Sequence, residues 1–306
     1  MSEQRFFLIP TIGHNAAAWA AMAFDTHPEI KCSMGFLAGH LMPHGEYDNI
    51  RRGRDEREQK LADIYSKKIQ ILRENASLDD LFDALSHDSP KRVFGDIHGM
   101  CVGGLLDNFG KYGPTKRKVA YATIIRHPIT WIDSYIRRLL WLHESGKGDP
   151  NLDSMKKKTQ RFCALNKGIE THIGFDPEDP KAQATIYTLQ TFMNRMIVDV
   201  RHAASSNGWR TFQMEKLLED RDYLYEAVHH LSHGTIEADQ DYLEKVISSE
   251  MENFGLLTTG NRDKRTPSDV FAQLERHQKI LMVETFKRKG VFELFAAQGY
   301  EFSLAE

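Results

Sequence analysis

The stretch RFFLIPTIGHNAAAWAAMAFDTHPEI, residues 5–30, decides the architecture expected of this chain. Residues 5–10 are short and apolar, which predicts a buried strand. Residues 15–26 are rich in Ala, which favours a helix, and His27-Pro28 ends it because the residue before proline is pushed out of the α region. A strand, a tight loop and a helix in this order are typical of phosphate-binding segments in α/β proteins.

The loop that begins this helix has an unusual composition for a phosphate site. Residues 13–18, GHNAAA, include no Lys, Arg, Ser or Thr. Backbone N–H groups at a helix N-terminus bind anions without side chains, so the loop remains a candidate. The alternative is a tight turn whose Ala-rich face packs on the sheet. Residues 104–112, GLLDNFGKY, are not a Walker motif, because they have five residues between the glycines and Tyr where Ser or Thr is needed.

The rest of the chain alternates between predicted strands and helices. The expected strands are 91–99, 118–128 and 209–214, and the second is apolar almost throughout, as in parallel sheets buried on both faces. The expected helices are 48–72, 77–85, 129–142, 216–232 and much of 268–298. This alternation predicts a helix-rich α/β fold with a P-loop-like parallel sheet flanked by helices.

Length and composition limit the expected number of domains and the expected classes of binding partner. The 306 residues are expected to form a single domain, with residues 144–182 as a mobile lid or a substrate-side helix pair. The net charge of -3 gives no reason to expect nucleic acid or a membrane surface. Three cysteines without paired spacing indicate a reduced, cytoplasmic compartment. No run reaches the roughly 18 apolar residues that a membrane span needs.

Polar residues follow three of the expected strands: His14-Asn15, Asp96 with His98, and Arg126 with Ser134. Ligands of open parallel sheets bind at the carboxyl ends of strands. A guanidinium at a strand end and a hydroxyl on the next helix can bind one phosphate together. The alternative is that Arg126 pairs with a carboxylate while Ser134 is solvated.

Histidines supply two further candidates. His98 follows a strand and is a candidate general base, since imidazole titrates near neutral pH; the alternative is a hydrogen-bonded loop residue. In HHLSH, residues 229–233, the spacing places His229 and His233 on one helical face. No carboxylate or Cys partner is evident there, so the sequence predicts no metal.

Together these features resemble the sulfotransferases that use 3'-phosphoadenosine 5'-phosphosulfate. HNAAAW followed by HPEI lies in the register of that family's first motif. Its 3'-phosphate motif has an Arg at a strand end, Pro two residues later and Ser eight later, as in Arg126, Pro128 and Ser134, and Tyr135 follows. Its catalytic His follows an upstream strand, where His98 stands 28 residues before Arg126. The resemblance covers residues 5 to about 302.

The resemblance implies a donor, a set of site residues and a reaction. His98 would be the general base, with His14 in the place of the family's basic loop residue. The residues assigned to the donor are His14, Asn15, Ala16, Ala17, Ala18, Trp19, Arg126, Ser134, Lys264 and Arg265. Trp19 would stack on adenine or else lie in the core, and the loop GNRDKR, 260–265, would contact the 3'-phosphate or else be a solvated charge cluster.

Departures from the family pattern lie at the 5'-phosphosulfate end. Ala16-Ala17-Ala18 replace Gly-Thr-Thr, and Asp96 stands where cytosolic members often have Lys, so a carboxylate pointing inward would repel the sulfonate. The expected function is a bacterial, cytosolic-type sulfotransferase that acts on a hydroxyl or amine of a small-molecule or glycan acceptor. The alternatives are a non-catalytic nucleotide-binding module on the same fold or another transferase. The acceptor and the oligomeric state, a homodimer included, stay open.

Overall fold

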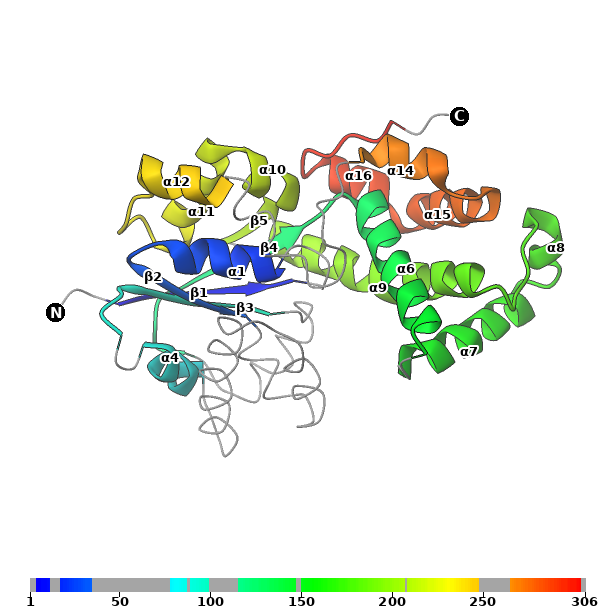
Figure 1. Cartoon of the computed structure of the whole chain (residues 1–306), viewed down its shortest axis with the longest axis horizontal. Helices are drawn as coiled ribbons and strands as arrows, with labels where there is room; N and C mark the ends of the chain where they lie inside the picture. Colours follow the sequence, from blue (N-terminus) through cyan, green and yellow to red (C-terminus); the bar gives the residue numbers. More distant parts are fainter. Residues whose placement is uncertain are drawn as a thin grey trace. The chain divides into compact units, whose positions relative to one another are not determined.

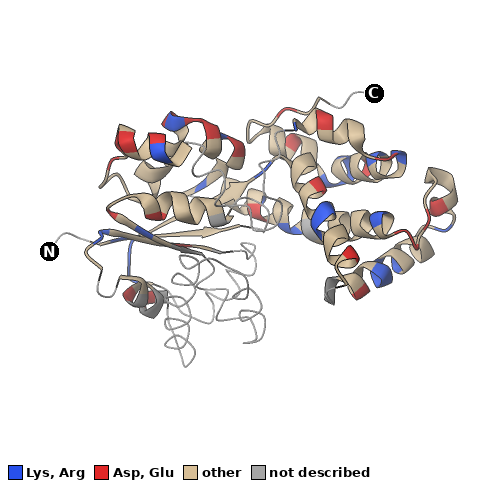
Figure 2. Cartoon of the chain, in the orientation of Figure 1, with Lys and Arg blue, Asp and Glu red and all other residues tan. Residues whose placement is uncertain are grey.

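The computed structural model describes residues 4–11, 17–34, 78–86, 89–98, 115–146, 150–206, 208–247 and 265–303. The chain divides into two compact units. The first unit is formed by residues 1–125 and 202–262, and the second by residues 126–201 and 263–306. Basic and acidic side chains are interspersed on the helices of both units (Figure 2), which agrees with the small net charge.

The first unit contains a parallel sheet with the strand order β2-β3-β1-β4-β5 (Figure 1). The strands are β1 (Arg5–Pro10), β2 (Ile30–Met34), β3 (Val93–His98), β4 (Val119–Ile125) and β5 (Trp209–Gln213). All the neighbouring pairs are parallel, so the predicted fold class is confirmed. Strand β2, IKCSM, was not predicted, because five residues that include Lys and Ser carry too weak a hydrophobic pattern.

Helices cover both faces of this sheet (Figure 1). On one face lie α1 (Ala17–Thr26), α10 (Met214–Glu219), α11 (Arg221–Leu231) and α12 (Gln240–Ile247), and on the other lies α4 (Leu78–Ser86). The helix expected over 216–232 is interrupted, because Asp220 accepts a hydrogen bond from the Tyr223 N–H at 3.1 Å and begins a new helix. The helix expected over 48–72 lies outside the described residues.

Strand β1 is buried on both faces. Phe7 and Ile9 belong to the core cluster beneath α1 and α11, and both are fully buried. Phe6, on the other face, packs against Phe82 of α4 with ring centroids 4.6 Å apart. The continuous apolar run of β1 therefore reflects two cores that meet at one strand.

The second unit is helical. Its helices are α6 (Pro128–Glu144), α7 (Pro150–Leu165), α8 (Ile169–Ile173), α9 (Pro180–Ser205, whose last residues belong to the first unit), α14 (Pro267–Gln273), α15 (Arg276–Lys289) and α16 (Val291–Ala296). The helices predicted over 129–142 and in 268–298 are confirmed. Residues 144–182 include α7, α8 and the start of α9, and their role as a lid or a substrate-side helix pair stays a prediction. Among the described helices, none has the length and apolar character needed to cross a membrane.

Candidate functional site

The carboxyl edge of the sheet has a switch point between the neighbouring strands β1 and β4. From β1 the chain continues to β2 on one side, whereas from β4 it continues to β5 on the other. Loops that leave neighbouring strands in opposite directions open the crevice in which α/β sheets bind ligands. The predicted first loop therefore starts from the favoured position of this sheet, and His98 ends β3, the other neighbour of β1, in register with Pro10.

Two buried threonines connect the ends of β1 and β4. The Thr11 hydroxyl donates to the Ile124 carbonyl at 2.8 Å, and the Thr123 hydroxyl donates to the Pro10 carbonyl at 2.8 Å. Both bonds lie beyond the last paired residues of the two strands, Leu8 and Tyr121. They fix the strand ends where the backbone ladder has stopped, and sequence reasoning missed both residues.

The structure describes only some of the residues that were predicted to form the first-loop site. His14, Asn15 and Ala16 lie outside the described residues, Ala17 begins α1, and the side chains of Ala18 and His98 are not described. Trp19 is 4% exposed and belongs to the core cluster with Phe7 and Phe24. A side chain buried to this extent leaves no ring face for a base, so the structure favours the core alternative for Trp19.

Asp96 lies inside the sheet rather than at its edge. It stands two residues before the end of β3 and is fully buried. Repulsion of a sulfonate by this residue would require a carboxylate that faces the ligand. A fully buried side chain does not meet that condition, so this departure from the family pattern carries less weight than the sequence indicated.

In the second unit, His127 caps the start of α6. Its Nδ1 accepts from the Ile129 N–H at 3.3 Å, and its Nε2 lies 3.1 Å from the Glu301 carbonyl. A carbonyl only accepts, so Nε2 carries the proton and the ring is the neutral tautomer that serves both bonds. The rings of Tyr300 and Phe302 lie 5.4 and 5.0 Å from it. The residue between Arg126 and Pro128 is thus structural, a role that sequence reasoning missed.

Arg126 is fixed against the first turn of α6. Its Nε donates to the Thr130 hydroxyl at 3.0 Å, and that hydroxyl donates to the His127 carbonyl at 3.0 Å. Ser134 is half-buried and stands one turn after Thr130 on the same helix. The stacking of Tyr135 on Trp131, with centroids 5.6 Å apart, assigns Tyr135 to the core.

Arg265 reaches the same two turns of α6 from far along the chain. Its Nη2 donates to Asp133 Oδ2 at 2.7 Å, and the same oxygen accepts from Arg137 Nε at 2.9 Å. Asp133 immediately precedes Ser134, so the predicted loop residue Arg265 contacts the helix that carries Ser134. Lys264 lies outside the described residues. Arg265 and Arg137 thus share one carboxylate, while the Arg126 guanidinium lies at the helix N-terminus, a position that favours an anion.

The histidines of HHLSH hold helix α11 and the following turn to the sheet. His230 Nε2 lies 3.1 Å from the Tyr121 carbonyl, and His233 Nε2 lies 3.4 Å from the Phe6 carbonyl. The ring of His229 stacks on Tyr225 with centroids 6.3 Å apart. These contacts explain the motif as part of the fold.

We predict that the stability of the first unit falls on acidification from about pH 7 to about pH 5. Burial lowers the pKa of His230 and of His233, and the hydrogen bonds to the backbone carbonyls oppose this only in part. Below the ordinary histidine pKa the unfolded chain therefore binds protons first, which favours unfolding. Urea unfolding across this range tests the prediction, and the double variant His230→Gln/His233→Gln should lose part of the slope. An identical slope in the double variant would contradict it.

Comparison with known proteins gives distant structural matches alone. No family model matches the chain, and neither does any curated protein. A structure described as a sulfotransferase domain from the curacin biosynthetic pathway has a TM-score of 0.45 at 11% identity, covering 98% of this chain and 99% of that one. A sulfotransferase from Alicyclobacillus acidocaldarius has a TM-score of 0.36 at 14% identity, covering 81% of this chain and 96% of that one. Similarity at this level does not assign a function to the chain, so a function has to be inferred from the chain's own residues.

Proposed function

We propose that this chain is a sulfotransferase that moves a sulfuryl group from 3'-phosphoadenosine 5'-phosphosulfate to a hydroxyl or amine. The observation that carries the proposal is the attachment of Arg126 to Thr130 in the first turn of α6, one turn before Ser134. A guanidinium, a hydroxyl and a helix N-terminus suit a phosphate dianion, whereas Arg265 is already paired with the Asp133 carboxylate. The sequence resemblance identifies that phosphate as the 3'-phosphate of the donor.

The reaction itself is assigned to the sheet edge of the first unit. Backbone N–H groups of residues 14–18 would bind the 5'-phosphate, with His14 as the nearby cation. His98 would take the proton of the acceptor while the acceptor atom attacks sulfur and the bridging oxygen leaves on 3'-phosphoadenosine 5'-phosphate. As in phosphoryl transfer, positioning and charge stabilisation would supply most of the catalysis. No metal takes part in this proposed reaction.

Arg126→Ala tests the phosphate assignment. It should weaken binding of 3'-phosphoadenosine 5'-phosphate at least tenfold, or about 1.4 kcal/mol, because one charge-assisted contact to the 3'-phosphate is lost. Adenosine 5'-monophosphate, which has no 3'-phosphate, should bind both proteins equally. Calorimetric titration measures each affinity.

Arg138→Ala is the matched control, since Arg138 is an exposed guanidinium on the same helix. It should leave both affinities unchanged. Equal losses for the two nucleotides in Arg126→Ala, or equal losses in the two variants, would refute a specific 3'-phosphate contact.

The pH dependence of turnover tests the role of His14. If His14 supplies the positive charge that a Lys supplies in relatives, the wild type should have a lower pH optimum than a Lys-bearing protein, because an imidazole is a weaker base than an amine. His14→Lys should extend the active range to higher pH. A rate that stays flat from about pH 6 to about pH 8 in the wild type would argue against this role.

The replacement of Gly-Thr-Thr by Ala16-Ala17-Ala18 favours one alternative, a module that binds the nucleotide without turnover. A screen with labelled donor against alcohols, phenols, sugars and amines separates the two functions. Transfer that disappears in His98→Ala supports the enzyme. Nucleotide binding without transfer to any acceptor class supports the module.

A further inference from the structure

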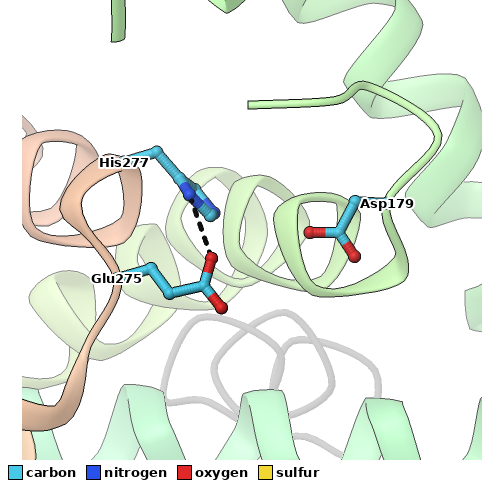
Figure 3. Close-up of side chains that lie close together, drawn as sticks. All are labelled: Asp179, Glu275 and His277. Carbon is cyan, nitrogen blue, oxygen red and sulfur yellow. Dashed lines mark ion pairs between the residues drawn. The ribbon is translucent and has the colours of Figure 1, made fainter. Parts of the chain in front are cut away.

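Three side chains of the second unit converge outside the proposed site: Asp179, Glu275 and His277 (Figure 3). Asp179 directly precedes α9, Glu275 directly precedes α15, and His277 lies in the first turn of α15. One potential ligand atom from each residue lies within 4.8 Å of the other two. Two carboxylates and an imidazole at this spacing form a set of donors that divalent transition metals accept.

His277 is the residue that points to a ligand. It is 4% exposed, and its Nε2 is buried without a hydrogen-bond partner. Its Nδ1 lies 3.4 Å from Glu275 Oε2, and the ring is directed toward the space between the two carboxylates (Figure 3). Buried polar atoms are normally paired, so an unpartnered nitrogen in such a cluster indicates a missing partner.

The two carboxylates keep capacity for a further ligand. Asp179 accepts from the backbone N–H groups of Lys181 at 3.1 Å and Ala182 at 3.3 Å, which uses part of the four or so lone-pair positions of a carboxylate. Glu275 Oε1 accepts from Lys181 Nζ at 2.7 Å, while Oε2 faces His277. Lys181 is therefore the cation with which a metal would compete.

We propose that Asp179, Glu275 and His277 bind a divalent transition metal of the zinc class, with water completing the coordination. The metal joins the turn before α9 to the turn before α15 and so acts as a structural link within the second unit. This proposal does not depend on the proposed function. It also goes against the sequence-based prediction of no metal, which considered only residues close together in the chain.

Titration of the full chain with Zn²⁺ by calorimetry, and with Co²⁺ by visible absorption, tests the site. Wild type should bind one equivalent tightly. Asp179→Asn and Glu275→Gln should each weaken that binding at least tenfold, because each removes one anionic oxygen ligand and keeps the shape of the side chain. Asn also serves well at a helix start, so Asp179→Asn should remain folded.

Two further variants make the outcome specific. Glu178→Gln removes a neighbouring exposed carboxylate outside the cluster and should leave the affinity unchanged. Lys181→Met removes the competing ammonium and should strengthen metal binding. Binding that is insensitive to Asp179→Asn and Glu275→Gln would assign the metal to other histidines and overturn the proposal. Loss of affinity in Lys181→Met, or absence of binding to wild type, would overturn it as well.

Discussion

His98→Ala is expected to lower kcat by about 10²–10⁴ while leaving the affinity for 3'-phosphoadenosine 5'-phosphate nearly unchanged. The imidazole would remove the acceptor proton as the sulfur–oxygen bond forms, so its loss affects the chemical step. The nucleotide product carries no acceptor, so its binding does not involve this proton. The register of His98 with Pro10 places both at the carboxyl edge of neighbouring strands, where the chemistry is expected.

Steady-state rates and calorimetry on the same preparations separate the two effects. His143→Ala is the control, because His143 is exposed near the end of α6. It should keep wild-type kcat and affinity. A normal kcat in His98→Ala would remove His98 from the mechanism, and a parallel loss of nucleotide affinity would give it a binding role instead.

Gly95→Ala is expected to lower the free energy of unfolding by about 3 kcal/mol. A Cβ at this position would overlap the ring of Phe7 on the neighbouring strand. Phe7 is fully buried, and its ring meets the edge of Phe24 with centroids 6.0 Å apart, so it cannot shift without disturbing α1. Glycine is unfavourable in strands, and here it allows an aromatic ring to lie across the backbone of β3.

Urea unfolding should show a lower midpoint for Gly95→Ala with an unchanged m value. A double-mutant cycle with Phe7→Leu identifies the cause, since a smaller side chain makes room for the added methyl group. The two changes together should cost less than their sum by about 1 kcal/mol. Strict additivity would show that the effect does not arise from the overlap with Phe7.

The central strands were predictable because their physical signals are local. RFFLIP and VAYATII are apolar almost throughout, and the parallel sheet follows from their alternation with helices. The start of α6 was predictable because Pro128 restricts the backbone there. Strand β2 was not, because its stability comes from pairing with β3 rather than from its own composition.

In the candidate site, too, only the features that depend on neighbouring residues could be proposed from the sequence. Arg126 and Ser134 could be proposed from the sequence because both lie on one strand-to-helix connection. The contact of Arg265 with Asp133 and the cluster around His277 depend on packing between segments that are distant in sequence. For Trp19 the local sequence was ambiguous. An aromatic side chain beside a ligand-binding loop and one in the core have the same local pattern, and the burial of Trp19 favours the core.

The most direct test of 3'-phosphate recognition is a calorimetric titration of the wild-type chain with 3'-phosphoadenosine 5'-phosphate, compared with adenosine 5'-monophosphate. We expect micromolar binding of the first nucleotide and at least tenfold weaker binding of the second, a difference of about 1.4 kcal/mol. Equal affinity for the two nucleotides, or no binding of the first, would contradict recognition of a 3'-phosphate. The likeness to sulfotransferases would then be one of fold alone.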